Sequence, residues 1–177
     1  MHTKAVYRVA QGLNEAGVVT IRFNFRGVGR STGSFDDGVG EMDDLRAALD
    51  WLEGAYPHLP LLTGGFSFGS MVGLAVGSED DRIVGLFGIG LPVDLGDRYD
   101  YDYLADVDKP ILVVQGENDE FGSGAQVASE LARLGSHISL VRVPDTDHYF
   151  VGYHDELCAA VRGYYDSGPG SRLLVMT

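Results

Sequence analysis

The pentapeptide at residues 65–69, Gly-Phe-Ser-Phe-Gly, has the spacing G-x-S-x-G around Ser67. A serine hydroxyl becomes a strong nucleophile when a base removes its proton, and a sharp turn between a strand and a helix exposes such a hydroxyl above a sheet. Glycines on both sides favour this turn, because side chains two positions from the serine would collide with neighbouring backbone. We predict that Ser67 is a nucleophile; the alternative is a purely structural turn.

The same turn would place the amide N–H of Phe68 at the first position of the following helix. Attack of a serine on a carbonyl group creates an oxyanion, and N–H groups at a helix N-terminus stabilise negative charge. We therefore expect the backbone N–H of Phe68 to be one oxyanion donor.

A base for Ser67 should lie on a loop that leaves a later strand at the same edge of the sheet. Five histidines compete for this role: His2, His58, His137, His148 and His154. The first two precede the serine motif, the third begins a strand at the opposite edge, and the last lies in the final helix or its entry loop. His148 follows the exit of a strand, so we predict that it is the base; the alternative is a histidine in a surface loop.

The imidazole of a catalytic histidine is oriented by a carboxylate. Asp119 closes the segment QGEND at residues 115–119, at the exit of the strand expected at residues 111–115, but Glu117 and Glu120 are rivals of the same chemical type in the same loop. The residues alone therefore favour Asp119 without excluding these two neighbours.

Short apolar runs alternate with segments of helical period, which is typical of a parallel sheet covered by helices. Strands are expected at residues 18–25, 61–66, 83–89, 111–115 and 138–143. Helices are expected around residues 6–13, 42–52, 68–77, 127–134 and 157–164. We predict one domain at residues 1–166, followed by a flexible tail at residues 167–177, which opens with turn formers.

The composition excludes several classes of protein. The chain has 26 acidic and 13 basic residues and a net charge of −13, which disfavours binding to nucleic acid. Its single cysteine, Cys158, excludes an internal disulfide. No run reaches the ~18 apolar residues of a membrane span, so we expect a cytoplasmic protein without a membrane partner. The oligomeric state is not predicted.

No cofactor is expected. The glycines of residues 27–33 follow a strand-like run, but their spacing misses G-x-G-x-x-G and no helix opens directly after them. The histidines are isolated and the acidic residues lack the spacing of a calcium loop, so no metal site is predicted.

Four stretches carry a resemblance to a known family: FNFRGVGRSTGSFDDG (residues 23–38), GGFSFGS (64–70), VVQGENDEFG (113–122) and VPDTDHYF (143–150). Over residues 2–165 the chain resembles small bacterial α/β-hydrolases of the serine type, which are related in fold to dienelactone hydrolases and to X-Pro dipeptidyl peptidase catalytic domains. The resemblance implies an α/β-hydrolase fold, with Asp119 as the acid and His148 as the base. Dienelactone hydrolases proper carry cysteine at the position of Ser67.

The chain departs from that family at its beginning. Family members have a further central strand before the first helix, and the loop after that strand supplies a second oxyanion N–H. We therefore expect an N-terminally incomplete sheet with a slot between residues 18–25 and 61–66, and we favour a longer natural protein. Loss of one oxyanion donor costs about 2.7–4 kcal/mol, so weak activity is expected here and higher activity with an upstream extension.

The predicted function is hydrolysis of a small carboxylic ester, or a related acyl substrate, through a Ser-His-Asp triad and an acyl-enzyme. The alternative is a hydrolase-fold protein with very weak or no catalysis. The segment between the strands expected at residues 83–89 and 111–115 is short, which predicts a minimal cap. Phe66, Tyr101 and Tyr103 are the candidates for a substrate rim.

Overall fold

A four-stranded parallel sheet forms the centre of the protein, in a computed structural model that describes residues 3–95 and 99–175. The strands are adjacent in chain order: β1 (Leu61–Phe66), β2 (Ile83–Ile89), β3 (Ile111–Gly116) and β4 (Ile138–Val143). Each neighbouring pair runs in parallel. Parallel neighbours need crossover connections, and helices supply two of the three here. The expected α/β class and parallel sheet are therefore confirmed.

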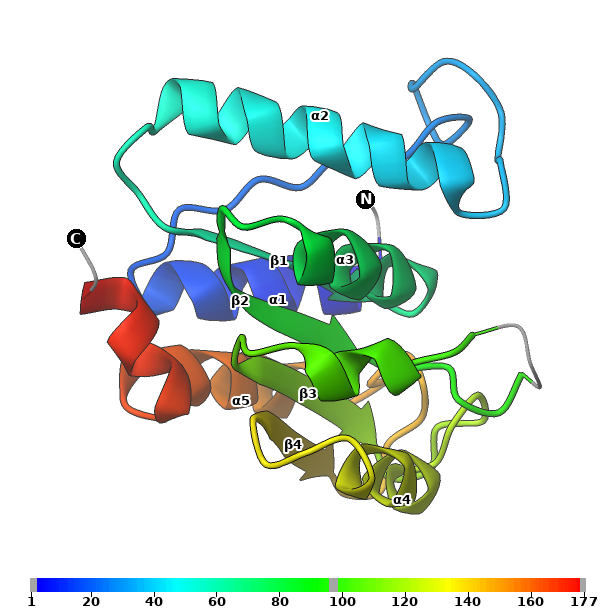
Figure 1. Cartoon of the computed structure of the whole chain (residues 1–177). Helices are drawn as coiled ribbons and strands as arrows, with labels where there is room; N and C mark the ends of the chain where they lie inside the picture. Colours follow the sequence, from blue (N-terminus) through cyan, green and yellow to red (C-terminus); the bar gives the residue numbers. More distant parts are fainter. Residues whose placement is uncertain (1–2, 96–98, 176–177) are drawn as a thin grey trace.

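Helices cover both faces of the sheet (Figure 1). The helices are α1 (Lys4–Glu15), α2 (Val39–Ala55), α3 (Phe68–Glu79), α4 (Gly124–Ala132) and α5 (His154–Asp166). α1 and α5 pack together on one face, whereas α2, α3 and α4 belong to the other. Between β2 and β3 the chain forms the short 3-10 helix η2 (Asp102–Asp106). Within the described residues, no helix is both long and apolar enough to cross a membrane.

The central strand β3 divides the core into two halves. Ile111 and Val113 pack into the cluster formed with α2, α3 and α4, whereas Leu112 and Val114 pack into the cluster formed with α1 and α5. All four side chains are fully buried. A strand that is apolar on both faces needs a helical layer on each side, and this explains why its sequence is a continuous apolar run.

The sequence prediction of a strand at residues 18–25 is wrong. This segment is extended but belongs to no ladder, and no described strand pairs with the outer edge of β1. Val19 remains 57% exposed although its type favours a strand. An apolar groove of about 500 Å³ lies between the segment, β1 and α1, and its lining includes Ser67. The expected slot is therefore present, and the strand propensity of the segment is not realised because no described strand lies beside it.

The tail after α5 contains the short 3-10 helix η3 (Pro169–Val175). Leu173 of this helix is only 7% exposed and packs in the same cluster as α1 and α5. The flexibility of the tail and the domain boundary at residue 166 stay predictions, but one apolar side chain of the tail is part of the core.

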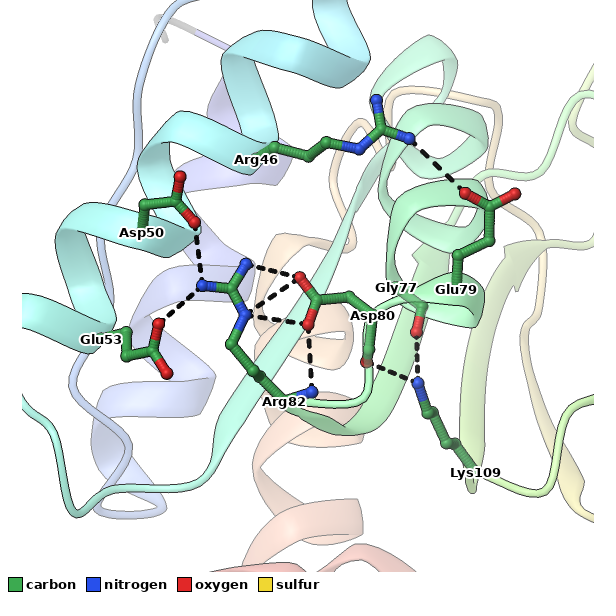
Figure 2. Close-up of polar contacts among 8 residues, drawn as sticks. All are labelled: Arg46, Asp50, Glu53, Gly77, Glu79, Asp80, Arg82 and Lys109. Carbon is green, nitrogen blue, oxygen red and sulfur yellow. Dashed lines mark hydrogen bonds and ion pairs between the residues drawn. The ribbon is translucent and has the colours of Figure 1, made fainter.

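A charged network ties α2 to the turn between α3 and β2 (Figure 2). The guanidinium of Arg82 donates to Asp80 at 2.6 and 2.9 Å, and also to Asp50 and Glu53 of α2, each at 2.8 Å. On the other side of the turn, the ammonium group of Lys109 donates to the carbonyl oxygen of Asp80 at 2.7 Å. The turn is therefore held from both sides.

We expect Arg82→Gln to lower the free energy of unfolding by about 1–2 kcal/mol, because three carboxylates lose a shared partner. The hydrogen bond from Arg82 lowers the pKa of Asp80, so its stabilising contribution is present above the ordinary aspartate pKa and is lost as the pH falls. The difference between wild type and variant in urea unfolding should therefore be full at pH 7 and shrink below pH about 4.

The matched control for this prediction is Arg46→Gln, because Arg46 is 45% exposed and pairs with exposed carboxylates. Its cost should stay below about 0.5 kcal/mol. Equal costs at the two arginines, or a cost at Arg82 that does not change with pH, would contradict the assignment.

Candidate active site

The loops that follow the four strands meet at one edge of the sheet, because parallel strands all end there. Ser67 follows β1, Gly90 follows β2, Asp119 lies in the loop after β3, and His148 lies in the loop after β4. The fold therefore brings the three sequence-predicted residues to the same edge although the chain separates them widely.

Ser67 occupies a strained turn between β1 and α3. Its φ is 54° and its ψ is −123°, a backbone conformation that residues other than glycine rarely adopt. The amide N–H of Ser67 donates to the carbonyl oxygen of Ile89 at 2.8 Å, which ties the turn to the end of β2. Phe68 is the first residue of α3, so the helix cannot satisfy its N–H group. This N–H remains suitable for an anion.

The two glycines of the motif differ in what the fold requires of them. A Cβ atom at Gly65 would lie 2.3 Å from the carbonyl oxygen of Gly69, so only glycine fits at residue 65. A Cβ atom at Gly69 would meet only the Phe25 ring, at 4.0 Å. The expectation that both positions exclude a side chain is confirmed for Gly65 and wrong for Gly69, because the first turn of α3 directs residue 69 into open space.

His148 and Asp119 form a buried pair. Nδ1 of His148 lies 2.7 Å from Oδ2 of Asp119, and the two side chains are 2% and 0% exposed. An ionised carboxylate only accepts hydrogen bonds. With Asp119 ionised and the imidazole neutral, Nδ1 would carry the shared proton and Nε2 would be an acceptor. The other oxygen of Asp119 accepts from the amide N–H of Phe121 at 2.8 Å. Both oxygens of this buried carboxylate thus have donors.

The two rival acids contact other groups. Glu117 pairs with Arg142 at 3.5 Å. Glu120 accepts a hydrogen bond from the backbone N–H of His148 at 3.3 Å and does not contact its ring. Of the three carboxylates in this loop, Asp119 is the one that lies against the imidazole.

Aromatic rings surround the imidazole of His148. The centroids of Phe66 and Phe121 each lie 4.8 Å from its own, and that of Tyr149 lies 5.2 Å away. Phe66 immediately precedes Ser67, so the imidazole packs against the residue next to the serine. Phe66 and Phe121 thus pack against the imidazole, whose side chain is 2% exposed.

Gly90 is a close neighbour that the sequence analysis missed. Its φ is +59°, and a Cβ atom there would lie 3.2 Å from Cε1 of His148 and 3.2 Å from Cε2 of Phe66. The available signal was a glycine directly after a strand, where a close backbone approach is common. The absence of a side chain at residue 90 lets the imidazole lie next to the β2 exit.

We expect Gly90→Ala to lower kcat/KM for an ester by about 10²-fold, because the new methyl group displaces the imidazole from its position. Gly17→Ala is the matched control: Gly17 has a φ of +86° but no atom within 4 Å of its Cβ position. Both variants should lose about 1–2 kcal/mol of stability from backbone strain. Steady-state kinetics and urea unfolding would separate the two effects, and an equal loss of activity at both glycines would contradict the argument.

The expected rim residues fall in different environments. Phe66 lies at the imidazole, as described above. Tyr101, by contrast, is 7% exposed and belongs to the core cluster beneath α2 and α3, and Tyr103 packs against the same cluster. Tyr101 comes directly before η2, and Tyr103 lies within it. That these two tyrosines line a substrate rim stays a prediction.

Among the described residues, no three or more histidine, cysteine, aspartate or glutamate side chains form a group that could hold a metal ion. Cys158 is a buried residue of α5.

Comparison with known proteins places this arrangement in a family. Residues 1–156 match the family model of the alpha/beta hydrolase domain. An uncharacterized protein of Rickettsia prowazekii is 35% identical over 170 residues, which cover 93% of this chain and 71% of that protein.

Two solved structures are similar throughout the described fold. An α/β serine hydrolase without lid from Xanthomonas campestris is 38% identical, with a TM-score of 0.85, covering 100% of this chain and 77% of that one. An α/β serine hydrolase homologue from Coxiella burnetii is 34% identical, with a TM-score of 0.84, covering 92% of this chain and 76% of that one. With the sheet, the serine turn and these matches in place, the chain belongs to the α/β-hydrolase family.

Proposed function

We propose that this hydrolase cleaves carboxylic esters of small molecules through an acyl-enzyme on Ser67. The observation that carries the proposal is the buried pair of His148 and Asp119, 2.7 Å apart, next to a strained serine turn. A buried imidazole held by a carboxylate, with its second nitrogen available, is the arrangement that activates a serine hydroxyl.

In the first half of the proposed reaction, Nε2 of His148 takes the proton of the Ser67 hydroxyl as Oγ attacks the ester carbonyl carbon. The amide N–H of Phe68 donates to the oxyanion that forms, and Asp119 stabilises the imidazolium. The C–O bond to the alcohol then breaks, and His148 returns its proton to the leaving alkoxide. An acyl group remains bonded to Oγ of Ser67.

In the second half, His148 removes a proton from water, and the hydroxide attacks the acyl carbon. Collapse of the second oxyanion breaks the bond to Oγ, which regains its proton from His148. The products are a carboxylic acid and an alcohol. Thioesters and amides would follow the same path, and esters are the default because an alcohol leaves more easily than an amine.

Rapid mixing with p-nitrophenyl acetate tests this proposal. We expect an initial burst of p-nitrophenol followed by slower turnover, together with a mass increase of one acetyl group on the peptide that contains Ser67. A folded protein that releases p-nitrophenol no faster than buffer, and gains no acetyl group, would reject the proposal.

A second candidate is a hydrolase-fold protein with very weak or no turnover. The observation that favours it is the open outer edge of β1, where no described strand pairs with the sheet. A strand at that edge would carry a loop close to Ser67, and such a loop could supply a further oxyanion donor. Acetylation of Ser67 without measurable turnover would favour this candidate over the esterase.

A further inference from the structure

We propose that Gln115 is a positioning residue that holds the carboxylate of Asp119 against His148; the inference rests on the proposed function. Gln115 is the last polar side chain of β3, and it is fully buried. Its side-chain amide lies between the loops that follow β2 and β3. Neither the serine motif nor the histidine loop contains it.

The contacts of Gln115 fix the orientation of its amide. Its Oε1 accepts from the backbone N–H of Leu91 at 2.7 Å, a group that can only donate. Its Nε2 donates to Oδ2 of Asp119 at 2.8 Å and to the carbonyl oxygen of Gly122 at 2.7 Å, two groups that can only accept when Asp119 is ionised. Rotating the amide by half a turn would set like groups against each other, so only one orientation is satisfied.

The contact with Asp119 is specific to one oxygen. Oδ2 receives Nε2 of Gln115 and also lies 2.7 Å from Nδ1 of His148, whereas Oδ1 receives the N–H of Phe121. The two fixed donors, one on each oxygen, determine the plane of the carboxylate. The imidazole is the third partner of this carboxylate, and its orientation follows from that plane.

Gln115 also joins two loops of the site. Leu91 follows Gly90, which lies against the imidazole, and Gly122 closes the loop that carries Asp119. This buried amide thus joins the β2 exit to the acid loop, in addition to the hydrogen bond from the N–H of Asp94 to the carbonyl oxygen of Phe121 at 2.8 Å. Loss of this amide would release the carboxylate while leaving every residue that touches the substrate in place.

The test is Gln115→Met, which keeps most of the side-chain volume and removes both the carbonyl oxygen and the NH2 group of the amide. We expect kcat for a p-nitrophenyl ester to fall by about 10- to 100-fold, with KM changed by less than about twofold. The far-downfield proton signal of the His148–Asp119 hydrogen bond should shift or broaden in one-dimensional NMR. A role limited to stability would not move this signal.

Gln126→Met is the control, because it makes the same chemical change at an exposed position at the start of α4. It should keep the wild-type kcat and the wild-type proton signal. If Gln115→Met does not fold, Gln115→Asn provides the second variant: it keeps an amide that is one carbon too short to reach Asp119, and it should show the same loss of kcat.

A double-mutant cycle with Asp119→Asn completes the test, because Gln115→Met should have no further effect on kcat once the carboxylate is gone. Folded Gln115 variants with wild-type kcat and an unchanged proton signal would overturn the inference while leaving the proposed function intact. An inactive wild-type protein would instead reject the proposed function itself.

Discussion

Ser67→Ala should lower kcat/KM for a p-nitrophenyl ester by about 10⁴-fold or more, because the acyl-enzyme can no longer form. The fold should tolerate the change, and the strain at residue 67 stays the same because alanine also has a Cβ atom in a turn with a φ of 54°. Urea unfolding and steady-state kinetics on the same preparation would separate loss of chemistry from loss of structure. The burst of p-nitrophenol should disappear together with steady turnover.

Ser78→Ala is the control for this prediction, since Ser78 lies near the other end of α3 and its hydroxyl donates to the carbonyl oxygen of Ala75. Its activity should match that of the wild type. Hydrolysis that persists in Ser67→Ala at more than about a tenth of the wild-type rate would show that another group performs the reaction.

Asp119→Asn should lower kcat by about 10⁴-fold with little change in packing, because the two side chains have nearly the same shape. In the wild type, the carboxylate of Asp119 makes three hydrogen-bond contacts, with Phe121, Gln115 and His148. An asparagine can satisfy only some of these donors. If its NH2 group faces Nδ1 of His148, Nδ1 must accept, which favours the imidazole tautomer with the proton on Nε2. That tautomer cannot accept the proton of Ser67, so the loss falls on kcat.

Asp145→Asn is the matched control, an identical change in the loop before His148. Asp145 is exposed and has a φ of 56°, a conformation that asparagine adopts readily. Its activity and stability should stay close to those of the wild type. If Asp119→Asn were as active as the wild type, or if Glu117→Gln or Glu120→Gln lost more activity than Asp119→Asn, the orienting acid would be a different residue.

The elements that could be predicted from the sequence are those in which the pattern of apolar residues reflects which faces are covered by other elements. The run at residues 111–114 is apolar throughout because helices cover both faces of β3, and the structure agrees. Residues 18–25 have an equally strand-like composition, but a ladder needs a partner, and no described strand lies beside them. Propensity alone therefore predicted one strand too many.

The candidate site, too, could be predicted only in part. Strand order and loop position were enough to bring Ser67 and His148 to one edge of the sheet. They could not separate Asp119 from its neighbours, because which carboxylate turns inward depends on donors such as Phe121 N–H and Gln115, which only the folded loop assembles. The burial of Tyr101 could not be predicted for the same reason: it depends on a core cluster that includes residues of distant helices.

The most direct test of the account is to locate the adduct of a fluorophosphonate probe by peptide mass spectrometry. We expect one adduct on Ser67 when the folded protein is labelled, and no adduct when the protein is unfolded in urea before the probe is added. The rate of labelling should be lower by about 10³-fold or more in His148→Ala. An adduct on another residue, or labelling of Ser67 at the same rate with and without the imidazole, would contradict it.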